Sequence, residues 1–169
     1  CLDSFLNSIP SSPNSDIELR DVMKYSVLAG GKRFRPILTY TVASLYDTEI
    51  EKADSCASAI ELIHIYSLIH DDLPPMDNDD IRHNQPSNHK VFGEAQAILA
   101  GDGLQALAFS LISNDPLINV DTKIKLLELM AKSSYAMAEG QSIDLSVVSK
   151  KVNLNILNKM HQKKTGALI

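Results

Sequence analysis

The stretch ELIHIYSLIHDDLPPMDNDD, residues 61–80, joins an apolar helical pattern to a run of carboxylates. Between Ala53 and about Asp72, apolar side chains recur every three or four residues, as they do on the buried face of a helix. Pro74-Pro75 predicts the end of this helix, because a residue that precedes proline is pushed out of the α region. We expect a long core helix whose apolar stripe consists of Ala59, Leu62, Ile63, Tyr66 and Ile69.

On either side of this helix, the chain reads as further helices separated by breakers. Pro10–Ser15 is a predicted loop, and Asp16 is a plausible N-cap for the next helix. Gly30-Gly31 is expected to stop that helix, and Pro36 to sit at the first position of another. We find no convincing strand and predict an all-α fold, an antiparallel helical bundle. The other predicted helices carry Leu19–Val27, Ile37–Leu45, Glu94–Leu111, Thr122–Leu145 and a segment from near Leu154, with residues 73–90 as a loop.

Composition narrows the classes of function. The chain has 169 residues, 44% of them hydrophobic, no Trp and a net charge of −5. The negative charge argues against a nucleic-acid partner, whose sites are basic. Cys1 and Cys56 have no metal-binding spacing. No apolar run reaches the roughly 18–20 residues that span a bilayer. The sequence begins at Cys rather than Met, so a segment that precedes it, including a targeting segment, is not excluded.

Five carboxylates fall within residues 71–80. Asp71 and Asp72 close a helix, where the C-terminal end of the macrodipole is already negative. A bound cation would offset that charge, and carboxylate oxygens suit Mg²⁺, which shares its coordination shell with substrate phosphates. The prolines stiffen the connection that returns Asp77 toward Asp71. The alternative is a solvated acidic loop with helix-capping aspartates; an EF-hand fails on spacing.

A basic segment, GGKRFRP at residues 30–36, suits an anion. Glycine lets the backbone approach an anion closely, and Lys32 and Arg35 are cations at a helix start. It is not a P-loop, because the spacing of that motif is absent. The alternative is a helix C-cap followed by solvated cations. His64 lies two turns before Asp71 on the same helix face. It is either a contact for a diphosphate or a structural histidine.

In order and spacing, four segments resemble the trans-prenyl diphosphate synthases, particularly the bacterial-type farnesyl and geranylgeranyl diphosphate synthases. The segments are GGKRFRP, ELIHIYSLIHDDLPPMDNDD, NHKVFGEAQAILAGD and KTGALI. The resemblance implies a helical bundle of the isoprenoid synthase type with its substrate cavity in the bundle core. Residues 1–169 would form the N-terminal part of one such domain, apparently truncated.

The resemblance also implies roles for individual residues. Those expected to hold Mg²⁺ against the allylic diphosphate are Asp71, Asp72 and Asp77. Those expected to bind isopentenyl diphosphate are Lys32, Arg35 and His64. Those expected at the allylic diphosphate are Arg82, Lys164 and Thr165. Catalysis is expected to depend on the three aspartates together with Arg82 and Lys164.

The sequence departs from the family pattern at three points. His83 stands where the family has a second Arg that helps bind isopentenyl diphosphate. Because His is fully charged only below a pKa of about 6.5, we expect weaker binding of this substrate at alkaline pH. The family's Gly-Gly-Gln reads Glu139-Gly140-Gln141, and the sequence offers no account of Glu139. The family's second aspartate-rich motif does not occur in these residues, so we expect the chain alone not to turn over substrate.

The implied reaction joins isopentenyl diphosphate to dimethylallyl or geranyl diphosphate through an Mg²⁺-dependent carbocation. A bulky Tyr66 five positions before Asp71, followed by Ser67, favours farnesyl diphosphate as product. Geranylgeranyl or geranyl diphosphate remain alternatives, as do a non-catalytic partner subunit and a plain structural helical domain. The resemblance further implies a homodimer, and we expect a cytoplasmic location.

Overall fold

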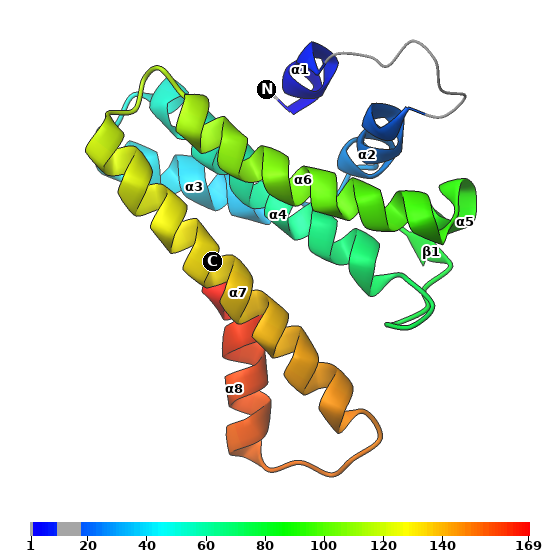
Figure 1. The fold of residues 1–169 in the computed structure, drawn as a ribbon. Helices are drawn as coiled ribbons and strands as arrows, with labels where there is room; N and C mark the ends of the chain where they lie inside the picture. The colour runs from blue at the N-terminus through cyan, green and yellow to red at the C-terminus, as the bar shows by residue number, and fades with distance from the viewer. Residues whose placement is uncertain (1, 10–17) are drawn as a thin grey trace. The chain divides into compact units, whose positions relative to one another are not determined.

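The computed structural model describes residues 2–9 and 18–169 (Figure 1). The predicted loop at Pro10–Ser15 and the predicted N-cap Asp16 lie outside the described residues. The chain divides into two compact units, which meet between Asp115 and Pro116. Helices dominate both units, which confirms the all-α prediction.

The first unit contains most of the helices and the only strands of the described residues. Its helices are α1 (Leu2–Ser8), α2 (Leu19–Val27), α3 (Phe34–Leu45), the short 3₁₀ turn η1 (Ile50–Ala53), α4 (Asp54–Asp71), α5 (Asn88–Phe92) and α6 (Glu94–Asn114). Between α4 and α5 lie two strands, β1 (Ile81–Arg82) and β2 (Gln85–Pro86).

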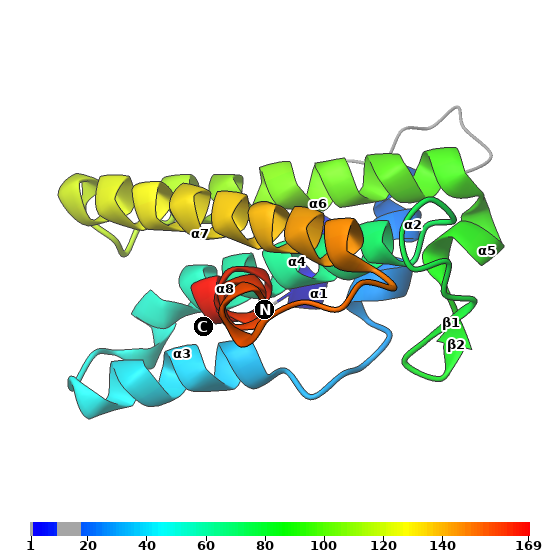
Figure 2. The same ribbon diagram turned by 90° about the horizontal axis from the view of Figure 1, so that it is seen from below.

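Helices α4 and α6 run side by side through this unit (Figures 1 and 2) and form its core. The predicted stripe of α4 is buried, and α6 presents small residues to it. At Gly101 of α6, an added Cβ would lie 2.1 Å from Nε2 of His70. The absence of a side chain there therefore lets α6 approach the end of α4 closely. By length and composition α6 is apolar enough to cross a membrane, but here it is the helix packed most extensively on α4.

Within the predicted loop at 73–90, the structure places a β-hairpin and the short helix α5, so the prediction of no strand was wrong. The strands pair antiparallel, Ile81 with Pro86 and Arg82 with Gln85. Two residues per strand are too few to show a period-two pattern in the sequence. The hairpin turn has positive φ at His83 (51°) and Asn84 (65°), as a type I′ turn requires.

Helix α3 also begins earlier than predicted, which places Pro36 third rather than first in it. Its N-cap is Arg33, which adopts the left-handed conformation (φ 49°, ψ 34°) and so reverses the chain after Gly30-Gly31. The Nη1 atom of Arg33 donates to Oε1 of the buried Glu61 on α4 at 2.7 Å. This contact fixes the start of α3 against the middle of α4.

The second unit consists of α7 (Val120–Val147), α8 (Leu154–Lys164) and the 3₁₀ turn η2 (Gly166–Leu168). Asn119 caps α7 by accepting from the backbone N–H of Thr122 at 2.9 Å. Asn153 caps α8 in the same way, by accepting from Ile156 at 3.0 Å. Both helices therefore begin at Asn side chains that satisfy otherwise unpaired N–H groups.

Candidate substrate and metal site

The acidic turn after α4 folds back on itself. The backbone N–H of Asp77 donates to the carbonyl of Asp71 at 2.8 Å, and that of Asn78 donates to the carbonyl of Leu73 at 3.1 Å. Asp77 is exposed and Asp71 is half-buried. The connection through the prolines thus returns Asp77 to Asp71, as expected from the sequence, and leaves two carboxylates at one end of α4.

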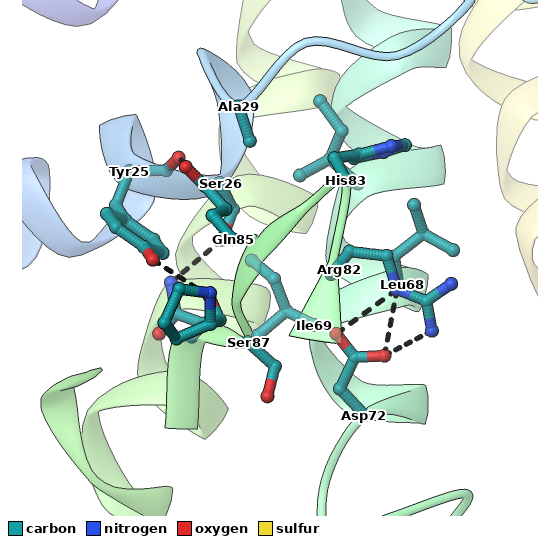
Figure 3. A pocket seen from close by; sticks show the side chains of 13 residues that line it. Tyr25, Ser26, Ala29, Leu68, Ile69, Asp72, Arg82, His83, Gln85 and Ser87 are labelled. Atoms are coloured by element: carbon teal, nitrogen blue, oxygen red, sulfur yellow. Dashed lines mark hydrogen bonds and ion pairs between the residues drawn. The ribbon is translucent and has the colours of Figure 1, made fainter. Parts of the chain in front are cut away.

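Asp72 lies in a different environment from its two neighbours. Its side chain is only 3% exposed and faces Arg82 of β1 (Figure 3). Nε of Arg82 donates to Oδ1 at 3.0 Å and to Oδ2 at 3.3 Å, and Nη2 also contacts Oδ1. Arg82 additionally reaches Asp79 at 3.1 Å. Both carboxylate oxygens of Asp72 are therefore engaged by the hairpin.

The contact between Asp72 and Arg82 affects the pKa of both side chains. Burial raises the pKa of the Asp72 carboxyl, and the hydrogen bonds from Arg82 oppose that shift. The hydrogen bond to Asp72 raises the pKa of Arg82, although partial burial opposes it. The guanidinium stays charged and forms a fork-like contact with the carboxylate. Asp72 thus holds β1 against the end of α4, and its role as a magnesium ligand stays a prediction.

The chemistry of the donor set fits Mg²⁺, because carboxylate oxygens are its usual protein ligands and substrate phosphates complete the shell. Within residues 2–9 and 18–169, however, no group of three or more His, Cys, Asp or Glu side chains is arranged to hold a metal ion. Asp71 and Asp77 are the pair brought together by the turn. They would supply part of such a site and leave the remaining positions to phosphate, water or other residues.

A cavity of about 580 Å³ opens beside α4. Loop residues 29–35, the middle of α4 and the hairpin turn form its walls. The lining includes all four residues that the sequence assigned to isopentenyl diphosphate: Lys32, Arg35, His64 and His83. Three separate elements therefore bring these side chains around one space.

The electrostatics of this cavity are those of an anion site. Nε of Arg35 is buried without a hydrogen-bond partner among the described residues, and burial lowers the pKa of this guanidinium. The carboxylate in the lining, Glu61, is ion-paired with Arg33. A diphosphate would provide both the negative charge and the acceptor that the Arg35 side chain lacks.

His64 is neutral at physiological pH. Burial, together with the positive charges of Arg35, His83, Arg33 and Arg82, lowers its pKa to about 4. A neutral imidazole still donates one hydrogen bond and accepts another. His64 can therefore contribute a hydrogen bond to an anion in this cavity rather than a full charge.

His83 reaches the cavity from the hairpin turn. An added Cβ on Gly31 would lie 3.3 Å from Cε1 of the His83 ring, so the imidazole rests against the glycine backbone. Gly31 has φ +106°, a conformation that side-chain-bearing residues rarely adopt. The glycine pair thus gives the loop its shape and gives the His83 ring room.

Tyr66 of α4 is buried in the core. Its ring meets His70 edge-to-face, with centroids 5.7 Å apart. Burial raises the pKa of the Tyr66 hydroxyl, and a hydrogen bond with Gln105 of α6 opposes that shift. The neighbouring Ser67 donates to the carbonyl of His64 at 2.7 Å and stays within its own helix. The contacts with His70 and Gln105 hold the ring in place. Such a fixed ring is compatible with the wall of a substrate cavity and equally with ordinary core packing.

Comparison with known proteins identifies the family. The polyprenyl synthetase model matches residues 16–169. The chain belongs to this family. It is 45% identical to a farnesyl diphosphate synthase of Haemophilus influenzae over 153 residues, covering 89% of this chain and 52% of the relative. A farnesyl diphosphate synthase of Escherichia coli is 43% identical over 172 residues, covering 99% of this chain and 56% of the relative.

Solved structures agree with the fold. The crystal structure of a geranyltransferase from Legionella pneumophila superimposes with a TM-score of 0.93 at 43% identity, covering 99% of this chain and 59% of that one. A geranyltranstransferase from Thermotoga maritima gives a TM-score of 0.85 at 38% identity, with 60% of its chain covered. The chain spans about half the length of the curated relatives it matches.

Two further residues predicted for the polyprenyl synthetase site, Lys164 and Thr165, belong to the second unit. Nζ of Lys164 donates to Oδ2 of Asp144 on α7 at 2.6 Å. Lys163 forms an ion pair with Glu139, the residue that replaces the first glycine of the family's Gly-Gly-Gln. Between these ion pairs lies Gly140, where an added Cβ would be 2.1 Å from the Lys164 backbone nitrogen. Thr165 is exposed and ends α8.

Sequence reasoning missed several residues that hold the predicted site residues or the segments beside them, each within its own unit. Glu61 and Asp144 are acidic partners of cations that lie far along the chain. Tyr25 of α2 donates from its hydroxyl to the carbonyl of Pro86, and Gln85 of β2 donates from its side chain to the carbonyl of Tyr25, so both link the hairpin to α2. Only the position of Glu61 inside an apolar stripe was a usable signal, because a buried carboxylate requires a partner.

Proposed function

We propose that this chain supplies the isopentenyl diphosphate site and part of the magnesium site of a prenyltransferase. That enzyme condenses isopentenyl diphosphate with dimethylallyl or geranyl diphosphate to make farnesyl diphosphate. The observation that carries the proposal is the cavity in which Lys32, Arg35, His64 and His83 converge. The likeness to relatives named farnesyl diphosphate synthase supports the same substrate class.

In the proposed reaction, the bond between the allylic carbon and its diphosphate breaks, and the double bond of isopentenyl diphosphate attacks that carbon. A proton is then lost from the new chain. Bound Mg²⁺ would neutralise the charge on the departing diphosphate. The carboxylates of Asp71 and Asp77 would hold that ion, and Arg82, Lys164 and Thr165 would contact the same diphosphate. Preorganised cations in a site of low dielectric constant stabilise such developing charge strongly.

The nucleophilic substrate would be held separately, in the cavity beside α4. Lys32, Arg35 and His83 would contact its diphosphate, and neutral His64 would add a hydrogen bond. Water must be kept from the carbocation, because water would trap it. The Tyr66 ring is the proposed limit to the growing hydrocarbon tail.

Product length is part of this proposal. Tyr66, followed by Ser67, lies a turn and a half before Asp71, where a ring would stop a chain that grows along α4. We therefore propose farnesyl diphosphate, with geranylgeranyl or geranyl diphosphate as the alternatives within the same class. A non-catalytic partner subunit would have no need of Asp71 and Asp77 in this turn. Residues 1–169 would be the N-terminal part of a single domain, in a cytoplasmic homodimer.

The test is a chimera in which residues 1–169 replace the matching half of the Escherichia coli relative. The chimera is incubated with labelled isopentenyl diphosphate, geranyl diphosphate and Mg²⁺, and the product is dephosphorylated and sized. We expect a fifteen-carbon alcohol, and its loss in an Asp77→Asn chimera that folds equally well. A folded chimera that binds both substrates without forming product would favour the partner-subunit alternative. A chimera that binds neither substrate would refute the proposal.

A further inference from the structure

The β-hairpin that carries Arg82 and His83 is anchored on α2. The Tyr25 hydroxyl donates to the carbonyl of Pro86 at 2.8 Å, and Nε2 of Gln85 donates to the carbonyl of Tyr25 at 3.3 Å (Figure 3). The Tyr25 ring also meets Phe92 edge-to-face, with centroids 5.3 Å apart. This ring contact does not involve the hydroxyl, so the ring stays in place when the hydroxyl is removed.

The same hairpin connects two parts of the proposed site. On one side Arg82 holds Asp72 at the acidic end of α4. At its turn, His83 rests against Gly31 in the wall of the anion cavity. Each strand has only two residues, and a two-stranded hairpin of this size is not stable by itself. Its position must therefore come from contacts outside the hairpin.

The chain on either side of the hairpin has its own attachments. Ser87 donates from its hydroxyl to the carbonyl of Asp79 at 2.6 Å. Nδ2 of the buried Asn88 donates to the carbonyl of Val22 at 2.9 Å and to Oγ of Ser26 at 2.8 Å. These contacts fix the base of the hairpin but do not reach its turn. The contacts that link β2 to α2 nearer the turn are those of Tyr25 and Gln85.

We propose that Tyr25 and Gln85 are positioning residues for diphosphate binding: they hold the hairpin so that His83 faces Lys32 and Arg35 across the cavity. Neither side chain lines the cavity itself. They act through the placement of the hairpin, and a hairpin docked for only part of the time lowers the apparent affinity in proportion. This inference rests on the proposed function, because it takes isopentenyl diphosphate as the occupant of the cavity.

The experiment titrates isopentenyl diphosphate into the 169-residue chain by calorimetry, for wild type, Tyr25→Phe, Gln85→Leu and the double variant. A hydrogen bond contributes about a factor of five to a docking equilibrium. We expect the double variant to bind at least threefold more weakly and each single variant to lie between it and wild type. Tyr40→Phe is the matched control, because it removes a tyrosine hydroxyl that donates to Asp54 away from the hairpin.

The NMR signals of the His83 imidazole provide a readout that needs no ligand. They should shift in both single variants and stay unchanged in Tyr40→Phe. Equal affinity in wild type and the double variant, or unmoved His83 signals, would overturn the inference and leave the proposed function intact. Weaker binding accompanied by shifts throughout α3 and α4 would show general loss of structure and would also overturn it. A wild-type chain that binds no isopentenyl diphosphate would remove the proposed function and this inference together.

Discussion

Replacement of Asp72 by Asn separates stabilisation of the fold from metal binding. The change keeps the shape of the side chain and removes the charge that Arg82 pairs with. Removing one partner from a fully buried ion pair costs about 3–5 kcal/mol. The Arg82 side chain is 32% exposed and retains its contact with Asp79. Solvent screening and that second partner reduce the cost, which we place at about 2 kcal/mol.

A loss of this size is measurable by calorimetry or by far-ultraviolet circular dichroism. For a protein of about 150–250 residues, each kcal/mol shifts the unfolding temperature by roughly 2–4 °C, so Asp72→Asn should lower it by about 4–8 °C. The matched control is Asp77→Asn. Asp77 is exposed, and its contact with Asp71 is made by its backbone N–H, which the substitution keeps. The unfolding temperature of this control should equal that of wild type.

Binding of Mn²⁺ in the presence of inorganic diphosphate, followed by electron paramagnetic resonance, completes the comparison. We expect Asp77→Asn to lose most of this binding at full stability. Asp72→Asn should retain more of it, at temperatures where the variant stays folded. Equal unfolding temperatures for Asp72→Asn and wild type, with a loss of Mn²⁺ binding as large as that of the control, would refute the structural role. Asp72 would then be a metal ligand, as the sequence first indicated.

Four other predictions follow from single contacts. The pKa of His64 is about 4 in the folded chain and near 6.5 in the unfolded chain, so the unfolded chain takes up the proton first as pH falls. The free energy of unfolding should therefore decrease between pH 6.5 and 4, and should decrease less in His64→Gln, as measured by urea unfolding. His83→Arg should strengthen isopentenyl diphosphate binding, as measured by calorimetry, because a guanidinium is always charged and offers more hydrogen-bond donors than an imidazole. Gly140→Ala would place a Cβ 2.1 Å from the backbone of α8 and should speed amide exchange throughout that helix, whereas Gly166→Ala, with its nearest atom at 3.8 Å, should not. Tyr66→Ala in the chimera should yield products longer than fifteen carbons, and an unchanged product would show that the ring is only core packing.

The helices were predictable because their signals are local. In α4 the apolar period, the proline pair at its end and the length all point to one helix, and the structure buries the predicted stripe. The same reasoning failed between residues 81 and 92. There the backbone is shaped by pairing across the hairpin and by anchoring on α2, and neither leaves a periodic pattern in so short a segment.

The candidate site shows the same difference between local signals, which the sequence reveals, and long-range contacts, which it does not. Lys32, Arg35 and His64 were proposed from a glycine-rich basic segment, a helix-face spacing and the family resemblance; the structure brings them to one cavity, and their role there stays a prediction. The ion-pair and hydrogen-bond partners of the predicted site residues and their neighbours could not be identified from the sequence. Arg33 meets Glu61 across 28 positions, and nothing in the sequence marks which carboxylate a given cation will find. Long-range polar pairs of this kind depend on how the helices pack.

The two carboxylates that open the acidic motif show why a motif alone does not assign roles. Asp71 and Asp72 are adjacent, so a helix turns their side chains roughly 100° apart. One lies beside the turn that returns Asp77, and the other points into the wall where the hairpin docks. A charge buried in that wall needs a fixed partner, and Arg82 supplies it. The structure therefore places two neighbouring, chemically identical carboxylates in different surroundings, and the hairpin holds the second of them.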